Sequence, residues 1–571
     1  MKPAADTPSG KPLIVQRDRS VLLDLHEAGA EEARGEISRF SELIKSPEHV
    51  HTYRITSLSI WNGAARGVNA TEVAATLARW SRNPVPKEVL AWVDEALARS
   101  GRIRLVRRDG RFGLETDAET LERILVVPSV AELVELLPDG FLVLRDGMRG
   151  MVKRALVRVG YPVDDVAGFE EGDPLTVELR DSDPEGRPFK VRDYQEQAAQ
   201  SFYAGRSERG GAGIVVLPCG AGKTVVGIRS MALYNVQTLV LTTNRSAVAQ
   251  WKRELLARTK LTEDQVGEYT GDTKEIRPVT VSTYQILTWR KSATSPFAHL
   301  ELFRSNNWGL VIYDEVHLLP APVFRVTADL QARRRLGLTA TLVREDGRED
   351  EVFSLIGPCR YDLPWRQLEQ RGYIAEARCV EVRVPFTPED RNLYEDSTRR
   401  ERVRLAAENA RKLDVLQALL RRHKNDRVLV IGQYMDQLEE ISRVIGAPLI
   451  TGASPNDKRE VLYGAFRRGL VPVLVVSKVA NFAIDLPDAN VAIQVSGTFG
   501  SRQEEAQRLG RVLRAKSDGS GAMFYALVTE STRDQEFSAH RQLFLAEQGY
   551  AYEILDASDV VSEASKIPDS A

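Results

Sequence analysis

Residues 213–224 read Gly-Ile-Val-Val-Leu-Pro-Cys-Gly-Ala-Gly-Lys-Thr, an apolar run followed by small residues and then by the start of a predicted helix. Small residues let consecutive backbone N–H groups converge on phosphate oxygens at a helix N-terminus. The residues predicted to hold phosphates are Pro218, Cys219, Gly220, Ala221 and Gly222. Lys223 would reach the β- and γ-phosphates, and the Thr224 hydroxyl would take a Mg²⁺ coordination site.

The phosphate-loop interpretation has one departure and one alternative. Leu217 stands where the usual pattern begins with glycine. The alternative is an ordinary glycine turn with an exposed lysine. The strand–loop–helix context and the Gly-Lys-Thr core favour the phosphate loop.

An acidic pair follows a second apolar run. Asp314-Glu315-Val316-His317 comes directly after Gly309–Tyr313. A carboxylate at the carboxyl end of a parallel strand is aimed at the crevice where ligands bind. We predict that Asp314 holds the Mg²⁺ shell and that Glu315 orients and polarises an attacking water. By itself such a pair is also a common helix start, so the prediction depends on the phosphate loop.

Around these motifs the chain alternates short β-branched runs with helices. Near-continuous apolar runs alternating with helices predict parallel sheets covered on both faces. One series extends from residue 213 to about 341, and a second runs from Arg427 to about Val528. The predicted fold class is therefore α/β, with two tandem parallel-sheet domains after a mixed α+β N-terminal region.

A helix in the second series carries Gln507-Arg508-Leu509-Gly510-Arg511-Val512-Leu513-Arg514. Arg511 and Arg514 lie one turn apart, so both could project across a cleft toward a γ-phosphate. The alternative is a solvated arginine face, which the phosphate site in the first domain disfavours.

The N-terminal region contains a winged-helix-like pattern at about residues 69–116. Two amphipathic helices precede two strands joined at Asp109-Gly110, and Asp-Gly is a strong hairpin signal. Five arginines on or beside the hairpin could contact phosphates, or the hairpin could be solvated on a partner-docking domain. These are Arg102, Arg104, Arg107, Arg108 and Arg111.

Composition excludes several classes of protein. The 571 residues carry a net charge of −2, so the overall charge does not indicate a polyanionic partner. One groove can still be basic in a nearly neutral protein. Three cysteines cannot form a disulfide framework and indicate a reducing compartment. The polar N-terminus lacks a signal-peptide core, and no apolar run approaches the ~20 residues that span a bilayer. We expect a cytoplasmic protein that makes no use of a membrane.

Taken together, the motifs resemble superfamily-two helicases, and within them the XPB helicases of the bacterial form. The match extends from Arg192 to Lys516, and the N-terminal region also resembles that form. The resemblance implies two RecA-like domains with ATP and Mg²⁺ between them. It also implies an adenine-reading motif at Arg192 and Gln195, and coupling of the Asp-Glu box to the arginine motif by His317 and Gln507.

The same resemblance implies residues that contact DNA or couple it to the nucleotide. They are Thr243 and Asn244, Thr283, Thr339 and Thr341, and, in the second domain, Ser477 and Lys478, with Asp485 on the nucleotide. Arg344-Glu345-Asp346 matches the family's strand-separating motif and is repeated as Arg348-Glu349-Asp350. Without the resemblance it would be interpreted as a solvated charged loop.

The expected domains follow from these assignments. They are a disordered tail at 1–10, an N-terminal accessory region at 11–185, a first RecA-like domain at 186–365, a linker with a thumb-like insertion at 366–415, a second RecA-like domain at 416–556 and a disordered tail at 557–571. The thumb-like segment, from about Pro385 to Leu405, resembles the family's insertion, with five arginines available for phosphates: Arg391, Arg399, Arg400, Arg402 and Arg404.

The expected function is ATP-dependent DNA unwinding, 3′ to 5′ by resemblance, in DNA repair. One alternative is a duplex translocase that hydrolyses ATP without separating strands. Another is an ATP-gated scaffold for a repair or transcription partner. Expected partners are DNA junctions and, in addition, a repair nuclease or a transcription protein.

Overall fold

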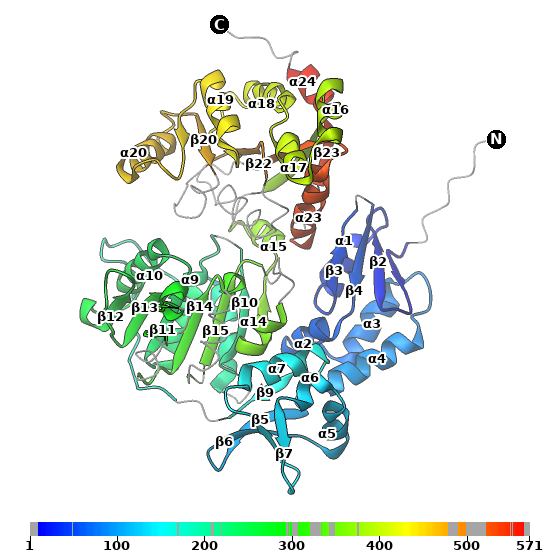
Figure 1. The fold of residues 1–571 in the computed structure, drawn as a ribbon, viewed down its shortest axis with the longest axis vertical. Coiled ribbons are helices and arrows are strands. Elements are labelled where there is room, and N and C mark those ends of the chain that lie inside the picture. Colours follow the sequence, from blue (N-terminus) through cyan, green and yellow to red (C-terminus); the bar gives the residue numbers. More distant parts are fainter. Residues whose placement is uncertain are drawn as a thin grey trace, which may run out of the picture. The chain divides into compact units, whose positions relative to one another are not determined.

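The computed structural model describes residues 10–47, 49–167, 171–206, 210–218, 220–292, 295, 297–299, 306–319, 332, 334–341, 349–373, 376–477, 489–497, 521–548, 550 and 552–564. These residues form two compact units (Figure 1). The first holds most of the chain up to Asp362, and the second holds the chain from Leu363 onward together with Lys45–Glu48 and Pro218–Ala221.

The first unit opens with a small sheet and a group of helices. The sheet has the order β1-β2-β4-β3. The strands are β1 (Leu13–Val15), β2 (Ser20–Asp24), β3 (Glu42–Lys45) and β4 (Val50–Arg54). The helices are α1 (Ala30–Ile37), α2 (Ser57–Ala65), α3 (Ala70–Trp80) and α4 (Lys87–Ala98). Helix α3 begins where Asn69 accepts a hydrogen bond from the Glu72 amide, as expected for an N-cap.

The predicted basic hairpin is present, but it is not a free wing. Asp109 and Gly110 both have positive φ, the conformation that a two-residue hairpin turn requires. The hairpin strands β5 (Ile103–Arg108) and β6 (Arg111–Glu115) lie inside a five-stranded sheet of order β7-β8-β6-β5-β9. The remaining elements are α5 (Ala118–Leu125), α6 (Pro128–Ala131), β7 (Val134–Leu136), β8 (Leu142–Leu144), α7 (Arg149–Arg158) and β9 (Val163–Asp165). The winged-helix prediction therefore has the right helices and hairpin but misses the strands that flank them.

The rest of the first unit is a seven-stranded parallel sheet of order β12-β13-β11-β14-β15-β10-β16 (Figure 1). Its strands are β10 (Ala212–Val216), β11 (Thr238–Thr242), β12 (Val266–Tyr269), β13 (Val279–Thr283), β14 (Leu310–Asp314), β15 (Arg334–Thr339) and β16 (Cys359–Asp362). The helical elements are α8 (Asp193–Tyr203), η1 (Ala204–Arg206), α9 (Lys223–Tyr234), α10 (Arg245–Arg258), η2 (Glu263–Gln265), α11 (Tyr284–Leu287), η3 (Val316–Leu318) and α14 (Glu349–Ile356).

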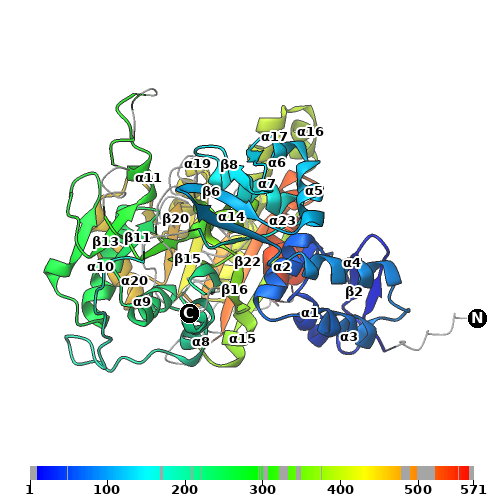
Figure 2. The same cartoon turned by 90° about the horizontal axis from the view of Figure 1, so that it is seen from below.

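Both faces of this sheet are buried. Ile214, Leu239 and Val311 point into one apolar core, which Phe353 and Ile356 of α14 complete. Their strand neighbours alternate to the other face and are equally buried. Helices α8, α9 and α10 lie across the sheet from α14 (Figure 2). The parallel, doubly covered sheet predicted from the apolar runs is confirmed.

The second unit repeats the architecture with the order β19-β20-β18-β21-β22-β17-β23. Its strands are β17 (Ala377–Val384), β18 (Val428–Gly432), β19 (Leu449–Ile450), β20 (Val473–Ser477), β21 (Val491–Gln494), β22 (Ala522–Thr529) and β23 (Tyr552–Asp556). Its helices are α15 (Trp365–Gln370), α16 (Pro388–Asp396), α17 (Arg399–Ala407), α18 (Arg411–Arg422), α19 (Met435–Ile445), α20 (Asn456–Arg467), α23 (Arg533–Glu547) and α24 (Ala557–Ala564).

Two predicted boundaries differ from the structure. Residues 377–384, placed in the linker, form β17 between β22 and β23, so the second domain begins before the thumb-like helices α16 and α17. Residues 557–564, placed in a disordered tail, form α24, whose Ala557, Val560 and Ala564 are buried in the second core. Among the described residues no helix is both long and apolar enough to cross a membrane.

Candidate active site

Three strand ends meet at the carboxyl edge of the first sheet. Parallel pairing sets Val216 of β10 opposite Thr339 of β15, and Asp314 of β14 opposite Leu338. The loop that follows β10, the acidic pair and the Thr-Ala-Thr segment therefore emerge side by side. This is the edge at which open parallel sheets bind their ligands.

The predicted phosphate loop ends at Gly222, which has φ +80° and precedes the first residue of α9. A Cβ built on Gly222 would lie 2.4 Å from Nε2 of Gln195, so a side chain here would require Gln195 to move, and the positive φ also favours glycine. Gln195 is buried and its Oε1 accepts a hydrogen bond from the Arg192 amide at 2.9 Å. The adenine-motif pair is thus brought to the loop, with Gln195 also capping α8. Glu196 then ties α8 to α9 through Arg229, at 2.7 Å.

Lys223 and Glu315 face each other at this edge. The Lys223 Nζ lies 3.2 Å from Glu315 Oε1, and their side chains are 10% and 21% exposed. Burial alone would raise the pKa of Glu315. The Lys223 ammonium and His317 together lower it by more, so the pKa lies below its ordinary value. Glu315 thus stays ionised at neutral pH and can accept a proton from water or orient it.

The backbone at Glu315 is unusual. Its φ of +49° is left-handed, which costs a non-glycine residue about 1–2 kcal/mol. The Glu315 amide hydrogen-bonds to Asp314 Oδ1 at 3.1 Å, and the Leu318 amide hydrogen-bonds to the Glu315 carbonyl at 2.9 Å. Strain of this kind is held where the surroundings over-determine it, typically at functional sites.

Asp314 is held from two sides. The Trp251 indole Nε1 donates to Asp314 Oδ2 at 2.8 Å, and the Tyr284 hydroxyl donates to the Asp314 backbone carbonyl at 2.8 Å. Burial and the adjacent Glu315 carboxylate raise the pKa of Asp314 to about 6. Sequence reasoning did not single out Trp251. The available signal was a tryptophan two helical turns after Thr243-Asn244.

This donor set fits Mg²⁺. Two adjacent carboxylates face one lysine at this site, so the site is short of positive charge. Mg²⁺ usually takes one or two protein oxygens, with phosphates and waters as its other ligands. Asp314 and the half-buried Thr224 could supply those oxygens. The described residues contain no cluster of three or more His, Cys, Asp or Glu of the kind that holds a metal without such additional ligands.

His317 links the acidic pair to the Thr-Ala-Thr segment. Its Nδ1 lies 2.6 Å from Thr339 Oγ1 and 3.5 Å from Glu315 Oε2. Thr339 Oγ1 in turn donates to the Thr341 carbonyl at 2.7 Å. All three side chains are buried. His317 thus contacts Thr339 directly, and Thr339 in turn is bonded to Thr341.

The predicted DNA-contacting residues of the first domain lie in two adjoining segments. Asn244 caps α10, its Oδ1 accepting from the Ala247 amide at 2.9 Å, while its Nδ2 donates to Thr243 Oγ1 at 3.2 Å. Thr283 precedes α11, and Gln285 Nε2 donates to the Thr243 carbonyl at 2.8 Å. The two segments are thus joined at the same edge of the sheet as Asp314.

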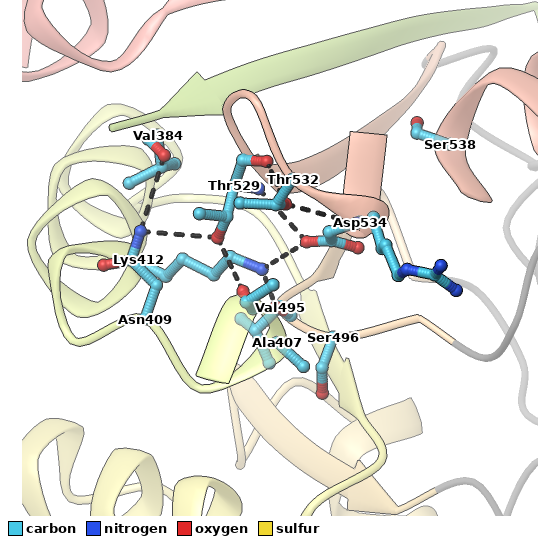
Figure 3. A network of polar contacts seen from close by, with 12 residues as sticks. Val384, Ala407, Asn409, Lys412, Val495, Ser496, Thr529, Thr532, Asp534 and Ser538 are labelled. Atoms are coloured by element: carbon cyan, nitrogen blue, oxygen red, sulfur yellow. Dashed lines mark hydrogen bonds and ion pairs between the residues drawn. The ribbon is translucent and has the colours of Figure 1, made fainter. Parts of the chain in front are cut away.

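In the second unit the corresponding edge holds a buried polar network (Figure 3). Lys412 Nζ lies 2.8 Å from Asp534 Oδ2 and 3.2 Å from the Val495 carbonyl. Asp534 also accepts from the Thr529 amide at 3.1 Å, and the Thr529 hydroxyl donates to the Ala406 carbonyl at 2.6 Å. Ser477, a predicted site residue, is the buried last residue of β20.

The thumb-like helices use most of their arginines internally. Arg391 donates to the backbone carbonyls of Glu530 and Ser531, each at 3.0 Å. Arg402 donates to the Tyr394 carbonyl at 2.9 Å, and Arg404 pairs with Glu408 at 2.7 Å. Arg399 and Arg400 are exposed. The set of five arginines expected for phosphates therefore includes three with structural contacts.

Several predicted site residues lie outside the described residues. They are Cys219, Arg344, Glu345, Asp346, Lys478, Asp485, Gln507, Arg511 and Arg514.

Comparison with known families matches three segments of the chain. Residues 368–569 match the ERCC3/RAD25/XPB C-terminal helicase family, and residues 188–344 match the family described as type III restriction enzyme, res subunit. Residues 13–135 match a helicase conserved C-terminal domain family.

Relatives align over nearly the whole chain. The chain is 52% identical to the DNA 3′-5′ helicase XPB of Mycobacterium tuberculosis, over 97% of this chain and 99% of that protein. It is 51% identical to the protein of the same name from Kineococcus radiotolerans, over 96% of this chain and 97% of that protein. It is 30% identical to the general transcription and DNA repair factor IIH helicase/translocase subunit XPB/SSL2 of Saccharomyces cerevisiae, over 96% of this chain and 72% of that protein. On the strength of these alignments and of the two parallel-sheet domains, the chain belongs to the XPB family of DNA helicases.

Proposed function

We propose that this protein is an ATP- and Mg²⁺-dependent DNA helicase that moves 3′ to 5′ and separates strands. The observation that carries the proposal is the facing pair Lys223–Glu315, at 3.2 Å, directly beside Asp314 and the glycine loop. Phosphoryl transfer depends mainly on positioning and charge stabilisation, and these groups supply both.

The geometry indicates how ATP would start the cycle. A γ-phosphate arriving at the loop competes with Glu315 for the Lys223 ammonium, because Lys223 Nζ lies 3.2 Å from Glu315 Oε1. Glu315, released but still ionised, then orients a water toward the phosphorus. Mg²⁺ held by Asp314 and Thr224 would neutralise charge on the β- and γ-phosphates.

Other roles rest on the sequence and its resemblance. Arg511 and Arg514 would meet the γ-phosphate as charge develops, with Gln507 beside them, and Asp485 would contact the nucleotide. Thr243, Asn244, Thr283, Ser477 and Lys478 would hold the DNA strand. Cleft closure and opening would ratchet that strand through the difference in DNA affinity between nucleotide states.

Arg344-Glu345-Asp346 is proposed to act at the duplex junction, where carboxylates repel phosphates and arginine engages them. The second copy, Arg348-Glu349-Asp350, gives a control, because its Asp350 makes structural ion pairs. Asp350 Oδ2 lies 2.8 Å from Arg154 Nε and 2.5 Å from Arg158 Nε, so it attaches α14 to α7 of the N-terminal region. Replacing the first triplet with alanine should impair fork unwinding and spare DNA-stimulated ATPase. Asp350→Asn should instead loosen the N-terminal region.

A duplex translocase is the second candidate, because several relatives carry the name helicase/translocase subunit. Strand displacement from forks with a 3′ or a 5′ tail, run beside triplex displacement, separates the candidates. Displacement that requires ATP, Mg²⁺ and a 3′ tail is expected. Triplex displacement without any strand separation would overturn the helicase proposal in favour of the translocase.

A further inference from the structure

Two aromatic side chains converge on Asp314 from different segments of the chain. Trp251 of α10 binds the carboxylate and Tyr284 of α11 binds the backbone carbonyl, each at 2.8 Å. Both are fully enclosed, with about 1% of each residue exposed. Each is therefore fixed in one orientation by the packing around it.

Each aromatic residue is joined directly to one DNA-contacting segment. Helix α10 begins after Asn244, and Trp251 lies seven residues further along it, so a rigid stretch of about 10 Å separates the two. Tyr284 is the residue immediately after Thr283. The two strands before these segments are also tied, since the Thr242 hydroxyl donates to the Ser282 carbonyl at 3.2 Å.

The packing of Trp251 also reaches the phosphate-loop helix. A Cβ on Gly227 of α9 would lie 2.6 Å from the Trp251 ring, so the glycine makes room for the indole. Glycine inside a helix costs about 1 kcal/mol relative to alanine. The close contact with the Trp251 ring explains why glycine nevertheless stands at this position. The tryptophan is thus enclosed between the helix that starts at Lys223 and the strand that ends at Asp314.

We propose that Trp251 and Tyr284 are positioning residues that couple DNA bound at Thr243–Asn244 and Thr283 to the orientation of Asp314. This inference rests on the proposed function. Strand phosphates that draw the two segments together would shift α10 and α11 as rigid elements and would move the two hydrogen bonds on Asp314. Because coupling is reciprocal, nucleotide bound at Asp314 must change DNA affinity through the same contacts.

The test measures this coupling in the full-length protein with Trp251→Phe and Tyr284→Phe. Tyr284→Phe removes only the hydroxyl that donates to Asp314, whereas Trp251→Phe removes the indole N–H donor together with part of the buried ring system. The dissociation constant for a fluorescent single-stranded oligonucleotide is measured by anisotropy with and without a non-hydrolysable ATP analogue and Mg²⁺. The ratio of the two constants is the coupling, and the DNA stimulation of ATPase is recorded beside it.

Two matched controls come from the same unit. Trp308 is a buried tryptophan at the amino end of β14, away from Asp314, and Tyr234 donates its hydroxyl to the Tyr203 carbonyl at 3.3 Å. Trp308→Phe and Tyr234→Phe should keep the coupling of the unmodified protein.

In each test variant, the coupling ratio is expected to be about fivefold or more closer to unity than in the unmodified protein. A ratio within about twofold of the unmodified protein in both variants would overturn the inference. So would an equal change in both dissociation constants, because it leaves the ratio intact. If Trp251→Phe fails to fold, Tyr284→Phe, which loses a single oxygen, decides the matter. An unmodified protein whose DNA affinity ignores nucleotide would refute the proposed function itself, a distinguishable failure.

Discussion

The two seven-stranded sheets share one strand order and differ at their carboxyl edges. Numbered along the chain within each sheet, both run third, fourth, second, fifth, sixth, first, seventh across the sheet. Each edge also has a lysine facing a carboxylate. Lys223 and Glu315 are 10% and 21% exposed, whereas Lys412 and Asp534 are 1% and 9% exposed. Accessibility separates the two pairs more than their chemistry does.

The difference follows from what comes after equivalent strands. In the first sheet the opening strand leads into the glycine loop, and the fifth leads into Asp314-Glu315. In the second sheet the opening strand leads into the thumb-like helices, and the fifth ends at Gln494. Lys412 and Asp534 then satisfy each other and the backbone around them. A repeated topology thus supports one reactive edge and one structural edge.

The largest effect is expected from Lys223, the more accessible of the two lysines. Lys223→Ala removes the point charge on the β- and γ-phosphates, so ATP hydrolysis should fall by about 10²-fold or more. Steady-state phosphate release with saturating DNA measures the loss. Near-normal turnover in this variant would end the phosphate-loop assignment.

The buried lysine should show the opposite pattern. Lys412→Ala removes the ammonium that faces the buried Asp534 carboxylate, and removing one partner of a buried ion pair typically costs about 3–5 kcal/mol. Hydrogen exchange of the peptide covering β22 should become much faster. The double variant Lys412→Met with Asp534→Leu, which removes both charges, should recover part of that protection. Unchanged exchange after Lys412→Ala would mean that the second edge is not held by this pair.

A smaller, pH-dependent effect on stability is expected at His51, which lies outside both seven-stranded sheets. Burial, with help from Arg34, lowers the pKa of His51 in β4 to about 4. Between pH 6.5, the ordinary pKa, and about pH 4, the His51 side chain is therefore mostly protonated in the unfolded chain and mostly neutral in the folded chain. The contribution of neutral His51 to stability is present above that value and is lost as the pH falls toward 4. Between pH 7 and pH 5 the loss is about 1–2 kcal/mol.

Calorimetry at the two pH values tests this expectation on the N-terminal region. His51→Gln should reduce the drop in its melting temperature. An equal drop in both proteins would assign the acid sensitivity to other groups.

Local patterns predicted most of the fold, and long-range contacts set what they missed. The apolar runs 213–217 and 309–313 indicated buried strands because nearly every residue in them is apolar. Strand β17 was placed in a linker because Arg378, Glu381 and Arg383 interrupt it. Glu381 is nevertheless buried, since Ser538 and Gln542 donate to it at 2.5 and 2.7 Å. Those partners lie more than 150 residues away in sequence, so the pattern could not reveal them.

The site shows the same division. Lys223, Thr224, Asp314 and Glu315 could be predicted because each motif follows a strand directly. Trp251 could not be predicted, because its hydrogen bond to Asp314 depends on how α10 packs against the sheet. Gln507, toward which His317 was expected to couple, lies outside the described residues. The contact of His317 with Thr339 could not be predicted, because it depends on the register of β14 against β15.

The central claim is that the more accessible pair, Lys223–Glu315, performs hydrolysis and that the buried pair, Lys412–Asp534, does not. Glu315→Gln and Asp534→Asn test it together, each replacing one carboxylate with an amide of the same shape. ATP affinity and single-turnover hydrolysis are measured for both folded proteins. The account predicts that Glu315→Gln binds ATP normally and hydrolyses it about 10²–10⁴-fold more slowly, while Asp534→Asn keeps its rate and loses stability. Weak ATP binding with normal chemistry in Glu315→Gln, or an equal loss of rate in both variants, would contradict it.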